Sequence, residues 1–411
     1  MTLFEELKLR GFIHQCTDEP SLNKLLMEKS VNFYIGFDCT AKSLHVGSLI
    51  QIMMMRLFQK YGHKPIILIG EGTTKIGDPS GKDQSRKVLS ADNIKDNASN
   101  LMKVFNKYLD FNSNNKAIYT NNAEWLDKIN YINFLRDYGK HFTINKMLSF
   151  DSVKLRLERE QSLSFVEFNY MILQAYDYLE LNKRFDCKLQ IGGSDQWGNI
   201  VNGIDLIRRD SSNEVYGLTT PLLTNAKNEK MGKTVDGAVW LNEDLLSSYD
   251  YWQFWRNVDD RDVFRFLRLF TDINIEEINI QEKEINIDIN AMKIRLANRA
   301  TEMLHGKERT LVAEKTASDI FRNEGSSENL PHLAIDLVKN SKVFLNDLIV
   351  EIGFATSKSE ARKLIKNSGV KINRIVVSEE LRLLTKDDFN AKNEVMISVG
   401  KKRHFLIKLI N

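Results

Sequence analysis

Short apolar runs alternate with helical patterns through the first 225 residues of the chain. Helical periodicity at Leu49 to Tyr61 and at Trp197 to Arg208 separates runs that are too short for buried helices and are bounded by polar residues. Buried strands that alternate with helices are typical of a parallel sheet covered by helices, so the pattern predicts an α/β nucleotide-binding fold. The predicted strands are Val31 to Ile35, Lys64 to Ile69, Lys188 to Ile191 and Val215 to Leu218.

The pattern changes after Thr234, where strand signals fade. Residues Ser247 to Ala317 show helical periodicity with aromatic stripes that predict a helical core, and the polar, turn-rich stretch Asn323 to Pro331 is typical of a linker. A compact module follows from about Val343. We therefore expect an α/β domain over 1–225, a helical domain over 226–325, a linker over 326–342 and a small α+β domain over 343–411.

Composition narrows the class of protein. A chain of 411 residues exceeds what one core usually fills, and it has no run near the ~18 apolar residues of a membrane span. The N-terminus carries Glu5 and Glu6 where a signal peptide would be basic, which favours a cytoplasmic or organelle-matrix protein. Cys16, Cys39 and Cys187 lack metal-ligand spacing, so we expect reduced thiols and no zinc site.

The net charge of +3 is unevenly distributed. Residues Ser341 to Asn411 contain 14 Lys/Arg against 8 Asp/Glu, a net charge of +6, whereas the rest of the chain carries −3. A basic C-terminus fits either a solvated lysine-rich tail or a module that contacts nucleic-acid phosphates. Charge alone leaves both interpretations open.

Two short segments far apart in the chain each have the features of half an ATP-activation site. In His45-Val46-Gly47-Ser48, a glycine that opens a helix permits close approach of a nucleotide, and the helix N-terminus offers backbone donors. In Lys230-Met231-Gly232-Lys233-Thr234, two lysines could neutralise a departing pyrophosphate. A His-x-Gly segment alone is weak evidence, but the pair indicates attack on an α-phosphate.

Loops after the predicted strands carry further polar residues, as expected where ligands bind beyond the carboxyl ends of a parallel sheet. Asp38 and Thr40 follow the first strand, and Gly192, Gly193 and Asp195 follow the third, where Asp195 could accept from ribose hydroxyls. The segment from Asp78 to Lys87 follows the second strand. Its cations fit a solvated hairpin tip or a loop that closes over a triphosphate.

One helix is predicted to line a small-molecule pocket. Ser164 and Glu167 form a capping-box pattern, and Tyr170, Gln174 and Asp177 follow at spacings that put them on one helix face. On an outward face these would be ordinary polar positions. On an inward face their burial requires polar partners, which a polar substrate would supply.

Taken together, these motifs resemble the bacterial-type tyrosyl-tRNA synthetase family of class I, over nearly the whole chain. At the C-terminus, Ser357 to Ile365 and Gly369 to Asn373 resemble a small RNA-binding module shared with a ribosomal protein, which favours RNA as the partner of the basic region. The matching motifs are Tyr-x-Gly-Phe-Asp-x-Thr-Ala at 34–41, the His45 segment, Asp78 with Lys82 and Arg86, Tyr170/Gln174/Asp177, Gly-Gly-Ser-Asp-Gln at 192–196 and Lys-Met-Gly-Lys-Thr at 230–234.

The resemblance implies a Rossmann-like catalytic domain that joins tyrosine to ATP and then transfers it to tRNA. It implies that Tyr34 and Asp177 bind the tyrosine phenol, that Asp78, Tyr170 and Gln174 hold the α-ammonium group, and that Gln190 and Gln196 lie beside the substrate. The implied ATP-binding residues are Asp38, Thr40, His45, Gly47, Ser48, Gly192, Asp195 and Lys233. The implied catalytic residues are His45, Lys82, Arg86, Lys230, Lys233 and Thr234.

The implied partners are L-tyrosine, ATP with Mg²⁺, tRNA with a tyrosine anticodon and a second copy of the chain, without a membrane or a tightly bound metal. Trp125 to Phe150 is a region that could form the dimer contact or belong to the core. Three residues depart from the family pattern, because Ser48, Ile35 and Cys39 stand where histidine, cysteine and proline are common.

Three other functions compete with this interpretation. A tryptophanyl-tRNA synthetase shares the class I motifs but normally lacks the C-terminal module and the Tyr34/Asp177 pair. A simple nucleotidylyltransferase would need neither the Tyr170 helix nor an RNA-binding module. A catalytically silent RNA-binding scaffold would not need His45 and the two lysines.

Overall fold

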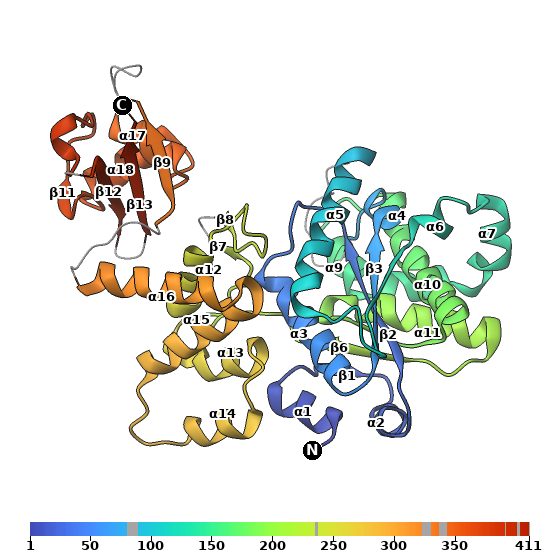
Figure 1. Cartoon of the computed structure of the whole chain (residues 1–411). Coiled ribbons are helices and arrows are strands. Elements are labelled where there is room, and N and C mark those ends of the chain that lie inside the picture. The colour runs from blue at the N-terminus through green and yellow to red at the C-terminus, as the bar shows by residue number, and fades with distance from the viewer. Residues whose placement is uncertain are drawn as a thin grey trace. The chain divides into compact units, whose positions relative to one another are not determined.

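The computed structural model describes residues 1–79, 89–234, 237–322, 330–336, 343–390, 392–400 and 403–410 (Figure 1). The chain forms two compact units. The first comprises Met1–Gly232, Trp240–Leu245 and Asp259–Met292. The second comprises Lys233–Val239, Leu246–Val258 and Lys293–Asn411.

A six-stranded sheet forms the centre of the first unit. All neighbouring strands pair in parallel except the edge strand β1, which pairs antiparallel with β6. The apolar runs predicted as strands all lie within or overlap β2, β3, β5 and β6, and the α/β fold is confirmed. In spatial order the strands are β1 (Gln15–Cys16), β6 (Tyr216–Thr220), β5 (Cys187–Gly193), β2 (Asn32–Asp38), β3 (Lys64–Gly70) and β4 (Ile118–Asn121).

Helices flank this sheet (Figure 1). The long ones carry clear sequence signals: His45 is the N-cap of α3, and the predicted capping box between Ser164 and Glu167 opens α10. The helices of this part are α1 (Leu3–Arg10), α2 (Glu19–Glu28), α3 (Val46–Lys60), α4 (Glu71–Thr74), α5 (Ala91–Tyr108), α6 (Ala123–Leu126), α7 (Tyr131–Asp137), α8 (Ile144–Ser149), α9 (Asp151–Glu158), α10 (Phe165–Phe185) and α11 (Trp197–Ser211), with 3₁₀ turns at Gly139–His141 and Ser194–Gln196.

The region from Ser247 to Ala317 is helical, as its periodicity predicts. Of its helices, α13 and α14 belong to the first unit, and α12 packs against α16 in the second unit. The helices are α12 (Ser248–Arg256), α13 (Val263–Phe270), α14 (Ile275–Glu282), α15 (Ile289–His305) and α16 (Lys307–Arg322), with a 3₁₀ turn at Asp260–Asp262 and a short hairpin of β7 (Lys233–Thr234) and β8 (Gly237–Ala238) before them.

The C-terminal region folds around its own sheet and core. Five strands run in the order β11-β10-β12-β13-β9, and β9 pairs in parallel with β13, so four described residues of the range predicted as a linker belong to this sheet. Residues 323–329 of the predicted joint, which runs from Asn323 to Pro331, lie outside the described residues. The elements are β9 (His332–Ile335), α17 (Leu345–Glu351), α18 (Lys358–Lys366), β10 (Val370–Ile372), β11 (Ile375–Val377), a 3₁₀ turn at Lys386–Asp388, β12 (Glu394–Val399) and β13 (Arg403–Leu409).

Two further sequence expectations concern membranes and thiols. Each helix in the described part of the chain is too short or too polar to cross a bilayer. Cys16, Cys39 and Cys187 are all free thiols, and Cys39 and Cys187 are buried.

A buried ion pair within α1 is hydrogen-bonded to the end of α13 in the first unit. The Arg10 guanidinium donates from Nε to Oε1 of Glu6 at 2.7 Å and from its other nitrogens to the carbonyls of Arg268, Thr271 and Ile273. The Tyr61 hydroxyl donates to the second Glu6 oxygen at 2.7 Å. Burial opposes ionisation of Glu6, but the hydrogen bonds from Tyr61 and Arg10 outweigh it and lower the pKa of this carboxyl.

Replacing Arg10 should therefore destabilise the first unit strongly. Both side chains are at most 4% exposed, so Arg10→Met leaves the Glu6 charge buried without its partner and should lower the free energy of unfolding by about 3 to 5 kcal/mol. Chemical denaturation measures the change. Lys8→Met on the same helix removes an exposed pair with Glu19 and an exposed contact with the Phe4 ring, and it should cost less than about 1 kcal/mol. An equal decrease in the free energy of unfolding in the two variants would contradict this account.

Candidate active site

The site lies where the strand order reverses. From β2 the chain adds β3 and β4 on one side, and it then returns to add β5 on the other side of β2. In open parallel sheets, such a switch point leaves a crevice at the carboxyl ends of the two central strands. Asp38 ends β2 and Gly193 ends β5, so these motif residues meet at the same edge of the sheet.

Two buried polar atoms at this switch point have no hydrogen-bond partner within the described residues. They are the hydroxyl oxygen of Tyr34, whose side chain is 1% exposed, and Oε1 of Gln190, whose side chain is 3% exposed. Tyr34 on β2 and Gln190 on β5 are register partners, so both side chains lie on the same face of the sheet. Because buried polar atoms normally have partners, the two atoms indicate that a polar ligand binds at this switch point.

Asp177 on α10 is a buried carboxyl group beside Tyr34. It is 2% exposed and accepts hydrogen bonds from Nδ2 of Asn122 at 3.0 Å and Nε1 of Trp125 at 2.7 Å. Burial raises the pKa of Asp177 to about 7 even though both hydrogen bonds favour the ionised form. Burial and then the Asp177 charge raise the pKa of Tyr34 well above its usual value, so Tyr34 stays a neutral phenol.

A chain of hydrogen bonds connects Asp177 to the end of β2. Asn122 donates from Nδ2 to the Thr73 hydroxyl at 2.9 Å and accepts from the Gly72 N–H at 2.8 Å. The Thr73 hydroxyl donates to Oδ1 of Asp38 at 2.8 Å, and the Tyr170 hydroxyl donates to the other Asp38 oxygen at 3.1 Å. Residues from β2, α4, the end of β4 and α10 are thereby held in fixed positions around one space.

A second polar cluster brings together Asp78 and Gln174, two of the three predicted ammonium-binding residues. Nε2 of Gln196 donates to Oδ2 of Asp78 at 2.8 Å, and Nε2 of Gln174 donates to Oε1 of Gln196 at 3.1 Å. Asn199 donates to Oε1 of Gln174 at 2.8 Å. Asp78, Gln174 and Gln196 come from three different parts of the sequence, and the structure joins them in one hydrogen-bonded group.

The His45 segment also contacts Met231 and Gly232 of the second signature. Nδ1 of His45 accepts the Gly47 N–H at 3.0 Å, which caps the first turn of α3. A Cβ atom at Gly232 would lie 2.6 Å from that Nδ1, and a Cβ atom at Gly47 would lie 3.1 Å from the carbonyl oxygen of Met231. Gly232 also has φ of +103°, a conformation that favours glycine. The glycines of both motifs are therefore required for this contact.

The other predicted site residues lie as follows. Asp195 is exposed in the 3₁₀ turn after β5, and a Cβ atom at Gly192 would lie 2.9 Å from that of Gln196. Thr40 is exposed and Ser48 is half-buried in the first turn of α3. Lys230 is exposed and forms a β-bridge with Thr224, and Lys233 and Thr234 form β7. Lys82, Arg86 and the side chains of Lys233 and Thr234 lie outside what the structure describes.

Sequence reasoning did not assign Asn122, Thr73 or Asn199 to the site, and it treated Trp125 only as a contact or core residue. Trp125 is buried and donates to Asp177, which makes it part of the hydrogen-bonded group around that carboxylate. The strand β4, which Asn122 follows directly, was not predicted because it has only four residues. Had this strand been predicted, a polar residue directly after it would have been a candidate site residue, because such a residue lies at the ligand-binding edge of the sheet.

Comparisons with known proteins agree with this geometry. Residues 26–322 match the family described as tRNA synthetases class I (W and Y), which does not distinguish tryptophan from tyrosine. Residues 324–407 match the family described as the tyrosine–tRNA ligase SYY-like C-terminal domain. The second match favours the tyrosine branch.

Full-length relatives and a solved structure also support the tyrosine branch. The chain is 57% identical to the tyrosine–tRNA ligase of Pelagibacter ubique over 99% of both chains, and 51% identical to that of Rickettsia bellii over the full length of both. It also resembles a C-terminally truncated mitochondrial tyrosyl-tRNA synthetase from Aspergillus nidulans, with a TM-score of 0.70 and 30% identity over 78% of this chain and 94% of that one. The chain therefore belongs to the bacterial-type tyrosyl-tRNA synthetases of class I.

Proposed function

We propose that Tyr34 and Asp177 recognise the phenol of L-tyrosine in the pocket between β2 and α10, as the first step of tyrosine–tRNA ligation. The observation that carries this proposal is the unpaired Tyr34 hydroxyl beside the buried Asp177 carboxyl group. A phenol is both donor and acceptor, so the substrate hydroxyl can donate to Asp177 and accept from Tyr34. Phenylalanine would leave the Tyr34 hydroxyl without a partner and would give the Asp177 carboxylate no donor beyond Asn122 and Trp125, which is a strong basis for rejecting it.

The second polar cluster, together with Tyr170 one helical turn before Gln174, suits the other end of the amino acid. Asp78 supplies the negative charge that an α-ammonium group requires, and Tyr170 and Gln174 supply oxygens that can accept from it. Gln190 and Gln196 complete the wall beside the substrate. The unpaired Oε1 of Gln190 and the hydrogen bond between Gln196 and Asp78 support this arrangement.

The first reaction is attack by the tyrosine carboxylate on the α-phosphate of ATP, which forms tyrosyl-adenylate and releases pyrophosphate. The carboxylate is already a nucleophile, so the protein needs to position the reactants and stabilise charge. We assign charge stabilisation to His45, Lys82, Arg86, Lys230, Lys233 and Thr234, with Mg²⁺ accompanying ATP as part of the substrate. Contact between the His45 segment and Met231–Gly232 supports a shared role for the two motifs.

The nucleotide is assigned to the carboxyl edge of β2 and β5. Gly47 and Gly192 have no side chain that would block close approach, and Asp195 is exposed at this edge, where it can accept from the ribose hydroxyls. Asp38, Thr40, Ser48 and Lys233 complete the proposed ATP site. In the second step the terminal adenosine hydroxyl of tRNA attacks the activated carbonyl group and AMP leaves.

The C-terminal domain is proposed to contact a tRNA with a tyrosine anticodon. Helix α18 presents exposed cations at Lys358, Arg362, Lys363 and Lys366, and the region from Ser341 carries a net charge of +6. Such a surface attracts phosphates whatever the base sequence. The three free thiols suit a reducing compartment, and we propose the cytoplasm.

A second copy of the chain is proposed to pack on α7 to α10. These helices share a small core that includes Phe134, Met147 and Ile172. Nine of the 22 large apolar side chains that are exposed among the described residues lie between positions 131 and 166, a density typical of an interface. They are Tyr131, Ile132, Leu135, Ile144, Leu148, Leu155, Leu157, Phe165 and Val166.

Removing the Tyr34 hydroxyl should weaken tyrosine recognition. Tyr34→Phe should raise KM for tyrosine about tenfold in pyrophosphate exchange and narrow the preference for tyrosine over phenylalanine, with kcat little changed. Tyr178→Phe is the matched control, because this neighbouring buried hydroxyl already donates to the Tyr216 carbonyl. Tyr178→Phe should lower the free energy of unfolding but leave the preference for tyrosine over phenylalanine unchanged. An unaltered preference in Tyr34→Phe would refute the proposed recognition.

The ionisation of Asp177 should set the pH dependence of tyrosine use. Its pKa of about 7 means that the carboxylate is lost as pH falls through 7, so kcat/KM for tyrosine should fall there. Trp125→Phe removes one donor to the carboxylate and should move that midpoint to higher pH. Trp252→Phe, which removes a hydrogen bond to Asn298, should leave the midpoint unchanged. A midpoint at the same or lower pH in Trp125→Phe would be inconsistent with this role.

A charge within the apolar surface should dissociate the proposed dimer. Ile132 is 69% exposed, and Ile132→Glu should convert the dimer to monomers at micromolar concentration in sedimentation velocity. Ile285→Glu, at a 98% exposed position outside this surface, should leave the dimer intact. A monomeric wild-type protein, or equal behaviour of the two variants, would count against the proposed interface.

A further inference from the structure

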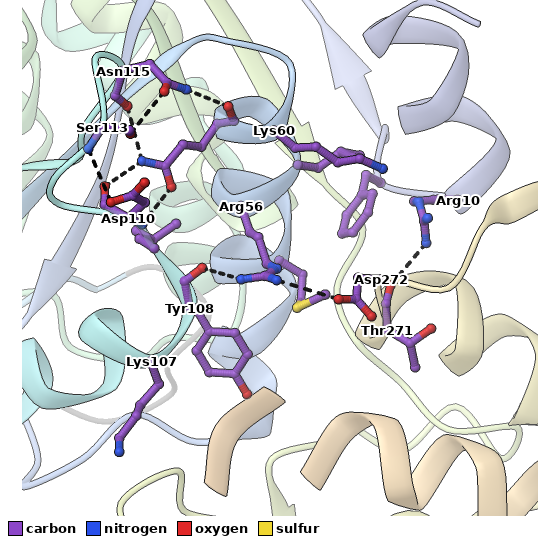
Figure 2. Close-up of a pocket in the computed structure, with 15 residues that line it drawn as sticks. Arg10, Arg56, Lys60, Lys107, Tyr108, Asp110, Ser113, Asn115, Thr271 and Asp272 are labelled. Atoms are coloured by element: carbon purple, nitrogen blue, oxygen red, sulfur yellow. Dashed lines mark hydrogen bonds and ion pairs between the residues drawn. The ribbon is translucent and has the colours of Figure 1, made fainter. Parts of the chain in front are cut away.

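The first unit contains a cavity that shares no lining residue with the proposed active site. It has a volume of about 550 Å³ and lies at the C-terminal end of α3, against the end of α5 and the residues Thr271 and Asp272 (Figure 2). Helix α3 begins at His45 and rises about 1.5 Å per residue, so the cavity lies roughly 20 Å from the histidine. Its volume is typical of small-molecule sites.

Cationic side chains with unused donors line this cavity. Lys60 and Lys107 are exposed and form no hydrogen bond or ion pair within the described residues. Arg56 donates to the Tyr108 carbonyl at 2.8 Å, but its other Nη atom is 3.6 Å from Oδ2 of Asp272, which is too far for a hydrogen bond. Figure 2 shows Arg56 between Tyr108 and Asp272. Three cations therefore retain donors for a ligand.

The other charged groups of the lining already have partners. Arg10 uses four of its five N–H donors on Glu6 and three backbone carbonyls. Asp110 accepts from the N–H groups of Asn112 and Ser113, which lower the pKa of its carboxyl. Asp272 faces Arg56. The lining carries four cationic side chains against two carboxylates, so the ligand that complements its excess of positive charge is an anion.

Apolar side chains make up another part of the wall. Phe12, Met53, Leu57 and Leu109 line the same space and leave room for more than an inorganic ion. A guanidinium group can bind a phosphate through two N–H groups at once, which would replace its loose contact with Asp272. Lys60 and Lys107 can each add a point charge to the same anion.

We propose that this cavity binds a small organic phosphate, with the phosphate group held by Arg56, Lys60 and Lys107 and the organic part packed against Phe12, Met53 and Leu57. This site is separate from the site proposed for tyrosine activation, so the proposal does not depend on the residue roles assigned above. It assigns a binding function to a region that the reaction itself does not use.

Inorganic phosphate is the probe, and its effect on thermal unfolding of the full chain gives an apparent Kd at constant ionic strength against chloride. Lys60→Met combined with Lys107→Met should weaken this Kd about tenfold or more. Lys95→Met combined with Lys103→Met is the matched control, because it removes two exposed lysines from α5 outside the cavity and should leave the Kd unchanged. Pyrophosphate exchange should be retained in both double variants.

A crystal soaked in phosphate gives the second measurement. Density for phosphate within hydrogen-bond distance of Arg56 and at least one of the two cavity lysines supports the site. An equal apparent Kd in the wild type and both double variants, or phosphate bound only elsewhere on the chain, would overturn the proposal.

Discussion

The carboxyl group of Asp177 is the constraint on which the rest of the site depends. Removing a carboxylate from water is costly, and here burial raises its pKa to about 7. Asn122 and Trp125 offset part of that cost, and each is fixed in turn by the sheet or by the backbone around it. The buried Asp177 carboxylate lies beside a Tyr34 hydroxyl that has no partner. This arrangement suits a substrate that carries a hydroxyl group.

The fold explains how distant segments reach one space. Because the strand order reverses between β2 and β5, Tyr34 and Gln190 become register partners although they are far apart in sequence. The same edge receives His45 at the start of α3 and Met231–Gly232 from the second signature. The contact is possible because Gly47 and Gly232 have no Cβ atom, so both motifs require glycine at these positions.

Much of this arrangement could be predicted from local patterns. The strand runs indicate the α/β fold, and the capping box at Ser164 sets the phase of α10, so the spacing of Tyr170, Gln174 and Asp177 is enough to assign them to one helix face. The residues that support them could not be predicted, because Asn122 follows a strand too short to show periodicity, and Trp125 reads as an ordinary core aromatic. Their roles depend on tertiary contacts that no local pattern encodes.

A crystal structure with L-tyrosine bound tests the central claim most directly. The account predicts that the substrate hydroxyl lies within hydrogen-bond distance of both the Tyr34 oxygen and the Asp177 carboxylate, with the ammonium group near Asp78. Tyrosine bound in the reverse orientation, or with its hydroxyl in contact with neither residue, would contradict it.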